Sequence, residues 1–200
     1  MKKIIRKILR EQFGYKQQLF DLLRTHNENN LEMVRMISQG QDIDILELLI
    51  EFFKENPKPP YFKILNHFDL SEDELINVLS EMYGEPVKIE GESIYDEDGN
   101  EIYFEDSDSY WEKREYDDNG NITYLENSNG NWSKAKFNEN GNLIYLRRSD
   151  GYWEKYQYDE WYGNQTYHEN SDGYWEKYGY DENGDLIYIE YSDGEIEDYR

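Results

Sequence analysis

The spacing of hydrophobic residues changes near residue 90. Before this point they recur at every third or fourth position, as in the stripe Leu75, Val78, Leu79 and Met82, which is the period of an amphipathic helix. After it they alternate with polar residues in short segments bounded by Asn, Asp and Gly, as strands do between tight turns. The chain is therefore expected to be an α+β protein, with a helical domain at residues 1–90 and an antiparallel β-meander at residues 91–200.

The helical half ends in its most clearly delimited segment, SEDELINVLSEMYG. Ser71 and Glu74 have the spacing of a capping box, and Gly84 is a natural helix stop. Residues 42–90 as a whole loosely resemble a helix-turn-helix or winged-helix arrangement, with three helices before an extended segment. The helix that would enter the DNA major groove is mostly acidic, so DNA reading is not favoured. Its groove-facing residues would be Glu72, Asp73, Glu74, Asn77 and Glu81.

The first residues, MKKIIRKILREQF, predict a basic amphipathic helix that packs its apolar stripe on its own domain. Docking on a membrane or in a partner's groove is the alternative. The segment has neither an uninterrupted apolar run nor a small-residue cleavage site, so it is not a secretory signal. No stretch reaches the ~18 apolar residues of a membrane span, and the absence of cysteine fits a reducing compartment. A cytoplasmic protein of a bacterial or phage-infected cell is expected.

Five copies of one phrase fill the second half of the chain. The first glycine of each copy recurs at intervals of 21, 21, 22 and 21 residues, and the extra residue belongs to the EWYGN turn. A tryptophan keeps the same phase in four copies, and Ile196 takes its place in the last. Each unit of about 21 residues is expected to be a β-hairpin with two glycine turns, while the sequence leaves open whether the sheet is open, coiled or closed. The first turn glycines are Gly99, Gly120, Gly141, Gly163 and Gly184.

The phrase YDENGDLIY, read with DGYWEKYGYD, resembles the YD repeats of the RHS family over about residues 95–200. In that family the repeats wind as β-strands into large shells around a toxin or form adhesive surface domains. This chain departs from the family pattern, because Asn or Asp follows the turn glycine where the family has arginine, and five units are too few to enclose a cargo. The resemblance implies strands and turns, and it implies no activity.

Charge narrows the possible functions. The chain carries 21 basic and 45 acidic residues, and residues 91–200 hold 9 of the basic and 29 of the acidic ones. Such a surface disfavours direct contact with nucleic acid through the repeats and steers the protein toward basic partners. The first hypothesis is a non-enzymatic acidic module that binds a basic, nucleic-acid-binding protein. Its specific form is a DNA-mimic inhibitor from a phage or mobile element, directed at a defence protein such as a CRISPR nuclease. The acids nominated for this contact are Glu112, Glu126, Glu154, Glu169, Glu176 and Glu190.

Two alternatives remain. In the first, the repeats are a structural or ligand-binding module that presents an aromatic platform to a saccharide or a protein, with a lysine two positions after each tryptophan either contributing to the platform or protecting the sheet from aggregation. In the second, the helical half is a DNA-binding regulator. The platform residues are Trp111, Trp132, Trp153, Trp175, Tyr152 and Tyr174.

Candidate catalytic chemistry is sparse. The histidines His26, His67 and His168 occur in unrelated contexts, and the sequence has neither a phosphate-binding loop nor a Ser/His/Asp order. The Asx-Gly segments place oxygen ligands at alternate positions, but turns alone explain them and the spacing does not match a calcium loop. We therefore expect no enzyme activity, no metal and no cofactor, and the oligomeric state stays open.

Overall fold

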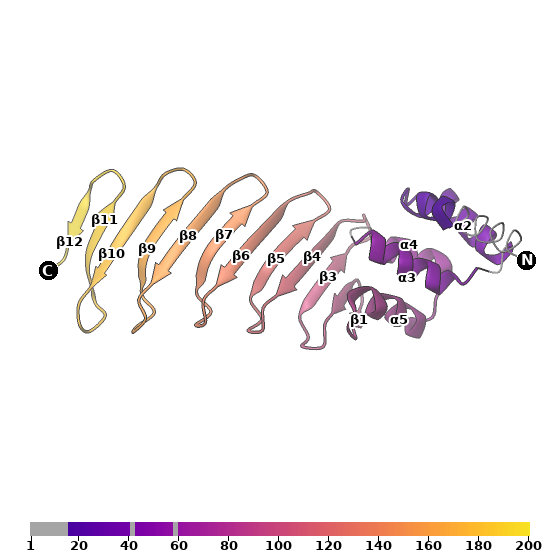
Figure 1. The fold of residues 1–200 in the computed structure, drawn as a ribbon, viewed down its shortest axis with the longest axis horizontal. Coiled ribbons are helices and arrows are strands. Elements are labelled where there is room, and N and C mark those ends of the chain that lie inside the picture. Colours follow the sequence, from indigo (N-terminus) through magenta and orange to yellow (C-terminus); the bar gives the residue numbers. More distant parts are fainter. Residues whose placement is uncertain (1–15, 41–42, 58–59) are drawn as a thin grey trace, which may run out of the picture. The chain divides into compact units, whose positions relative to one another are not determined.

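The computed structural model describes residues 16–40, 43–57 and 60–200. The basic helix predicted at the N-terminus lies outside these residues. The chain is an α+β protein in which helices precede twelve antiparallel strands (Figure 1). It divides into two compact units, Met1–Trp111 and Glu112–Arg200. No helix among the described residues is long and apolar enough to span a membrane.

The first unit is built on a helical core. Phe52 and Phe53 of the third helical segment are fully buried, and Phe53 packs edge-on against Tyr61 at 5.2 Å between ring centroids. The capping box predicted for Ser71 and Glu74 is present and confirmed. Residues 16–23 are helical. The helices that follow are α2 (Glu28–Gly40), α3 (Ile45–Glu55), α4 (Tyr61–Leu65), the short 3-10 helix η1 (Asn66–Phe68) and α5 (Glu72–Tyr83).

Three strands complete the first unit, and the third of them is tied to helix α4. They are β1 (Lys88–Glu90), β2 (Ser93–Tyr95) and β3 (Glu101–Glu105). Both Tyr103 and Glu105 of β3 are buried. Glu105 accepts hydrogen bonds from the backbone N–H groups of Phe62 and Lys63, at 2.9 and 2.8 Å. The predicted domain boundary at residue 90 thus falls inside the first unit, because β3 supplies part of its core.

The second unit is the predicted meander of β-hairpins. Each strand pairs antiparallel with its neighbours in the sequence, in the order β4 to β12. A register shift recurs before the last residue of β4, β6, β8 and β10. The strands are β4 (Trp111–Tyr116), β5 (Ile122–Asn127), β6 (Trp132–Phe137), β7 (Leu143–Arg148), β8 (Trp153–Tyr158), β9 (Gln165–Asn170), β10 (Trp175–Tyr180), β11 (Leu186–Tyr191) and β12 (Ile196–Asp198).

This sheet has no hydrophobic core. Among residues 112–200, all of which the structure describes, only Glu126 and Ile189 are buried. Figure 1 shows the hairpins from β4 to β12 as an open single layer, with no other element of this unit stacked on them. Side-chain pairs across neighbouring strands must therefore supply most of its stability, at about 0.2–1 kcal/mol for each pair.

Candidate functional site

The acidic residues of the second unit are concentrated in its turns. The strands from Glu112 onward carry nine acidic and eight basic residues, so they are almost neutral. The turns between these strands carry twelve acidic residues and no basic one. The turns line up at the two ends of the strands (Figure 1). The first turn row comprises the turns after β4, β6, β8 and β10 and holds eight of the acids, while the second turn row, after β5, β7, β9 and β11, holds four.

The opening aspartate of a turn organises the backbone of that turn. Asp117 Oδ1 accepts from the N–H groups of Asn119 and Asn121 at 3.0 and 2.9 Å, and Gly120 follows with a φ of 80°. Hydrogen bonds from the Asn121 side chain and backbone lower the pKa of Asp117. Asp181 accepts in the same way, and its pKa is lowered by the hydrogen bond from the Asp185 backbone. All five turn glycines named from the sequence have positive φ.

The second residue of each turn in the first turn row is an exposed acid. No hydrogen bond or ion pair within the described part of the chain engages these side chains. Because like turns are two strands apart, they recur about every 9.6 Å along the sheet. The four residues are Asp118, Glu139, Glu160 and Glu182.

The inserted residue of the fourth repeat produces a longer, hydrogen-bonded turn in the same row. The carboxylate of Asp159 accepts from four consecutive backbone N–H groups, those of residues 161–164. The hydroxyl of Tyr162 donates to the carbonyl of Glu182 at 2.8 Å. Trp161, at the tip, is 90% exposed. Exposed tryptophans are typical of protein-binding surfaces, because tryptophan is enriched among the residues that dominate binding energy.

The six acids nominated from the sequence lie on strands and are divided between the two faces. The tryptophan face, which carries Trp132, Trp153 and Trp175, includes Glu126, Glu169 and Glu190. The opposite histidine face, which carries His168, includes Glu112, Glu154 and Glu176. Each of the six is engaged by a cation or a hydroxyl within its own unit. The donors are Arg114, Tyr124, Tyr152, Lys155, Tyr174 and Lys177.

The aromatic platform nominated from the sequence is likewise divided. Trp111 belongs to the first unit, where it stacks on Tyr103 at 6.4 Å between ring centroids. On the tryptophan face, lysine ammonium groups cover the indole rings. Lys155 Nζ lies 4.6 Å from the ring centroid of Trp153 and 2.8 Å from Glu169 Oε1, which raises the pKa of Lys155 and lowers that of Glu169.

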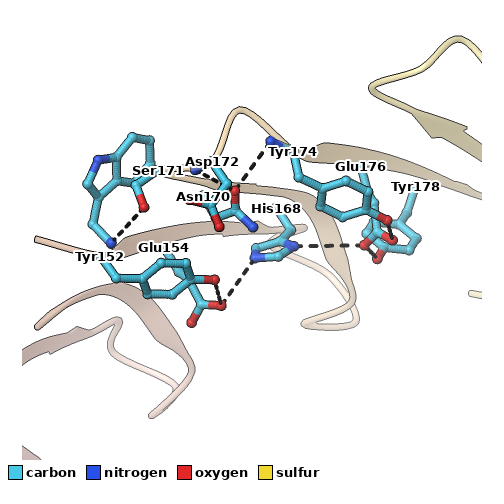
Figure 2. Close-up of polar contacts among 10 residues, drawn as sticks. Tyr152, Glu154, His168, Asn170, Ser171, Asp172, Tyr174, Glu176 and Tyr178 are labelled. Carbon is cyan, nitrogen blue, oxygen red and sulfur yellow. Dashed lines mark hydrogen bonds and ion pairs between the residues drawn. The ribbon is translucent and has the colours of Figure 1, made fainter. Parts of the chain in front are cut away.

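Tyr152 and Tyr174 lie on the histidine face, where they donate to carboxylates on either side of His168 (Figure 2). His168 Nε2 is 3.8 Å from Glu154 Oε1, and its Nδ1 is 3.8 Å from Glu176 Oε2. The imidazole stacks on Tyr156 at 4.7 Å between ring centroids. This cluster links strands β8, β9 and β10.

The tyrosine hydroxyls of this cluster donate hydrogen bonds to carboxylates, and these bonds raise the pKa values of the tyrosines. The hydrogen bond to Glu176 raises the pKa of Tyr174 to about 12. Burial and the hydrogen bond to the same carboxylate raise the pKa of Tyr178. These phenols therefore stay protonated at neutral pH.

Sequence reasoning missed the cluster because it treated His168 as an isolated histidine. The signal was available in the repeat, since the matching positions in the other repeats hold the apolar residues Phe104, Leu125, Leu146 and Ile189. No group of three or more His, Asp or Glu side chains among the described residues could hold a metal ion.

The comparisons with known proteins give fold similarity only at a low level. No family model and no curated protein sequence matches the chain. A crystal structure of TcdB2–TccC3–Cdc42 is similar at 19% identity over 46% of this chain and 5% of that chain, with a TM-score of 0.37. A Tc holotoxin pore from Photorhabdus luminescens is similar at 14% identity over 52% of this chain and 7% of that chain, with a TM-score of 0.40. The present chain thus spans a small fraction of the length of these structures, and the similarity assigns neither a family nor an activity.

Proposed function

We propose that the chain is a non-enzymatic binding protein whose first turn row docks on a basic surface of a partner protein. The observation that carries this proposal is the uneven distribution of charge in the second unit. The first turn row holds eight acidic residues and no basic one, whereas the strands are nearly neutral. A row of one sign of charge steers encounter with a surface of the opposite sign and suppresses other partners.

Turn acids suit this role better than the strand glutamates. Each strand glutamate nominated from the sequence already has a donor within the sheet, whereas Asp118, Glu139, Glu160 and Glu182 have exposed side chains without such donors. The opening aspartates stay ionised into the acidic range because their pKa values are lowered by turn hydrogen bonds. The turn row thus combines regular spacing with persistent charge.

A nucleic-acid-binding protein is the partner class that we favour, with the turn row taking the place of phosphates. Such proteins present Lys and Arg to the DNA backbone, and those side chains would be attracted by the acidic turns. The specific form of the proposal is an inhibitor from a phage or mobile element that blocks a defence protein such as a CRISPR nuclease. The absence of cysteine is compatible with action in the cytosol.

The two alternative functions have weaker support. A saccharide platform needs free ring faces, but lysines lie over Trp153 and Trp175 at 4.6 and 4.5 Å from the ring centroids. A DNA-binding regulator would use helix α5, whose first turn is acidic. The Ser71 hydrogen bonds lower the pKa of Glu74 and so keep it charged against phosphate.

The test is capture of proteins from a bacterial lysate by the immobilised full chain, with duplex DNA as competitor. The first variant combines Asp118→Asn, Glu139→Gln, Glu160→Gln and Glu182→Gln. The matched control combines Asp150→Asn, Asp172→Asn, Asp193→Asn and Glu195→Gln, which removes the same number of charges from the second turn row. We expect the first variant to lose DNA-competed basic proteins by about tenfold or more, and the control to keep them.

Two outcomes would reject the proposal. Equal capture by both variants would show that the position of the charge is irrelevant. Partners that duplex DNA cannot displace would show that the turn row does not occupy a nucleic-acid site. Mass spectrometry of the captured proteins provides both readouts.

A further inference from the structure

The tryptophan face repeats one row of side chains across four neighbouring strands. In two rows the order is tyrosine, lysine, glutamate and then tryptophan or isoleucine. These rows are Tyr145–Lys155–Glu169–Trp175 and Tyr167–Lys177–Glu190–Ile196. Within them the glutamate neutralises the lysine, with N–O distances of 2.8 and 3.4 Å. The first strand pair of the second unit, β4 with β5, also sets Lys113 opposite Glu126.

One row breaks this pattern by placing arginine where the others have glutamate. It runs Tyr124–Lys134–Arg147–Trp153, so two cations are direct cross-strand partners. Like charges opposite one another destabilise a sheet. A sheet shaped by stability alone would keep the glutamate. This row thus lacks the ion pair that the neighbouring rows make.

The cations of this row have no carboxylate partner among the described residues. Lys134 and Arg147 are both exposed, and Lys134 Nζ lies over the Tyr124 ring at 5.4 Å from its centroid. Lys136, on the same face and opposite Tyr145, is a third exposed cation without an ion pair. A basic aromatic patch thus lies in the middle of a unit that has 9 basic and 21 acidic residues.

We propose that the basic patch, defined as Lys134, Lys136 and Arg147 with the flanking rings of Tyr124 and Trp153, binds an acidic peptide segment of a partner protein. The neighbouring rows indicate that the bound group is a carboxylate. In the row of Lys155, Glu169 takes the position of Arg147, and its carboxylate accepts a hydrogen bond from the lysine. An incoming carboxylate can accept charge-assisted hydrogen bonds from Lys134 and Arg147.

A short peptide fits this patch better than a long polyanion. The hairpin β6–β7 is flanked at its two ends by the turn acids Glu139 and Asp150, both of which are exposed. A six-residue strand is about 20 Å long, and charges interact strongly within a Debye length of about 8 Å. A chain of phosphates or sulfates extending beyond the patch would meet these acids, whereas a few carboxylates confined to its centre would not.

The test is an NMR titration of the isotope-labelled full chain with acetylated, amidated tetraglutamate. We expect binding near the millimolar range, about −4 kcal/mol, with shifts centred on Arg147 and on the indole N–H of Trp153. Arg147→Glu restores the residue of the other rows, so it should fold at least as well and lose affinity by about tenfold or more. The control is Arg148→Glu, which makes the same change of charge at the adjacent residue on the opposite face and should keep the binding.

A reciprocal variant tests whether the same arrangement of two cations creates a binding site in a neighbouring row. Glu169→Arg would set two cations against each other between Tyr145 and Trp175 and should create a second binding site for tetraglutamate. The proposal is overturned if tetraglutamate does not bind, or if Arg147→Glu and Arg148→Glu weaken it equally. It is also overturned if a heparin-derived disaccharide shifts these signals and the peptide does not. Since the turn-row variant retains Arg147, failure here leaves the acidic turn row to be judged by its own experiment.

Discussion

At the scale of single residues, the repeat makes each deviation interpretable. His168 occupies a position where three of the other ~21-residue repeats have leucine or isoleucine. Its Nε2 is buried and has no hydrogen-bond partner, although it lies 3.8 Å from Glu154 Oε1. Stacking on Tyr156 offsets part of this disadvantage. An unsatisfied buried nitrogen costs about 1–3 kcal/mol, and an aromatic pair contributes about 0.5–1.5 kcal/mol, so the histidine is expected to be a net destabilising choice.

We therefore predict that His168→Leu stabilises the second unit. The free energy of unfolding should rise by about 0.5–1.5 kcal/mol, because the unsatisfied nitrogen is removed and the aliphatic residue of the other units is restored. Urea unfolding of the full chain, followed by tryptophan fluorescence, measures this. Ile189→Leu is the control at the matching position and should change stability by less than about 1.5 kcal/mol. A loss of stability in His168→Leu would mean that the contacts with Glu154 and Glu176 outweigh the unsatisfied nitrogen.

At the scale of elements, helix α4 depends on a strand for its start. Its N-cap is Pro60, which makes no side-chain capping bond. The carboxylate of Glu105 on β3 caps the helix instead. It accepts hydrogen bonds from the backbone N–H groups of Phe62 and Lys63. The hydroxyl of Tyr103 donates to the same carboxylate at 2.7 Å. Burial raises the pKa of Glu105, against the opposing effect of these hydrogen bonds.

Replacing Glu105 with glutamine should destabilise the first unit by about 1–3 kcal/mol, because an amide nitrogen would face a backbone N–H group. The pH dependence gives a second readout. A raised carboxyl pKa contributes stability that is complete below the ordinary pKa of glutamate and is lost as pH rises through the raised value. The stability difference between wild type and Glu105→Gln should therefore grow as the pH falls from about 7 to about 5.

Urea unfolding at these two pH values, followed by far-UV circular dichroism at helical wavelengths, checks the Glu105 prediction. Glu97→Gln, an exposed acid in the turn between β2 and β3, is the control and should change stability by less than about 0.5 kcal/mol. A difference that shrinks toward pH 5 would indicate that the pKa of Glu105 is lowered by its hydrogen bonds.

The elements themselves were largely predictable, because local signals define them. The capping box at Ser71, the turn glycines and the alternation along each strand all act over a few residues. The bond from Glu105 to helix α4 was not predictable, since it joins residues more than 40 positions apart. The partners of the strand glutamates were only partly predictable. Pairs such as Tyr124–Glu126 lie two positions apart and follow from strand alternation, whereas Lys155–Glu169 and Lys177–Glu190 depend on the cross-strand register.

At the scale of the molecule, the two units are stabilised in different ways. The first unit has a buried helical core that includes Phe52 and Leu79. The second unit buries almost nothing and relies on hairpin pairing between neighbouring repeats, as repeat proteins do. Its excess of acids lies in the turns, where like charges repel without being neutralised by the strands. Binding to a basic partner would relieve this repulsion.

This repulsion predicts an unusual response to salt. Raising sodium chloride from about 20 mM to about 500 mM shortens the Debye length to a few ångströms and screens the turn charges. The same screening weakens ion pairs such as Lys155–Glu169, but exposed pairs contribute only about 0–1 kcal/mol each. The thermal midpoint of the second unit, followed by tryptophan fluorescence, should therefore rise by several degrees. The variant that neutralises Asp118, Glu139, Glu160 and Glu182 should respond less, because it begins with less repulsion. A midpoint that falls with salt would show instead that the ion pairs of the tryptophan face dominate the electrostatics of the sheet.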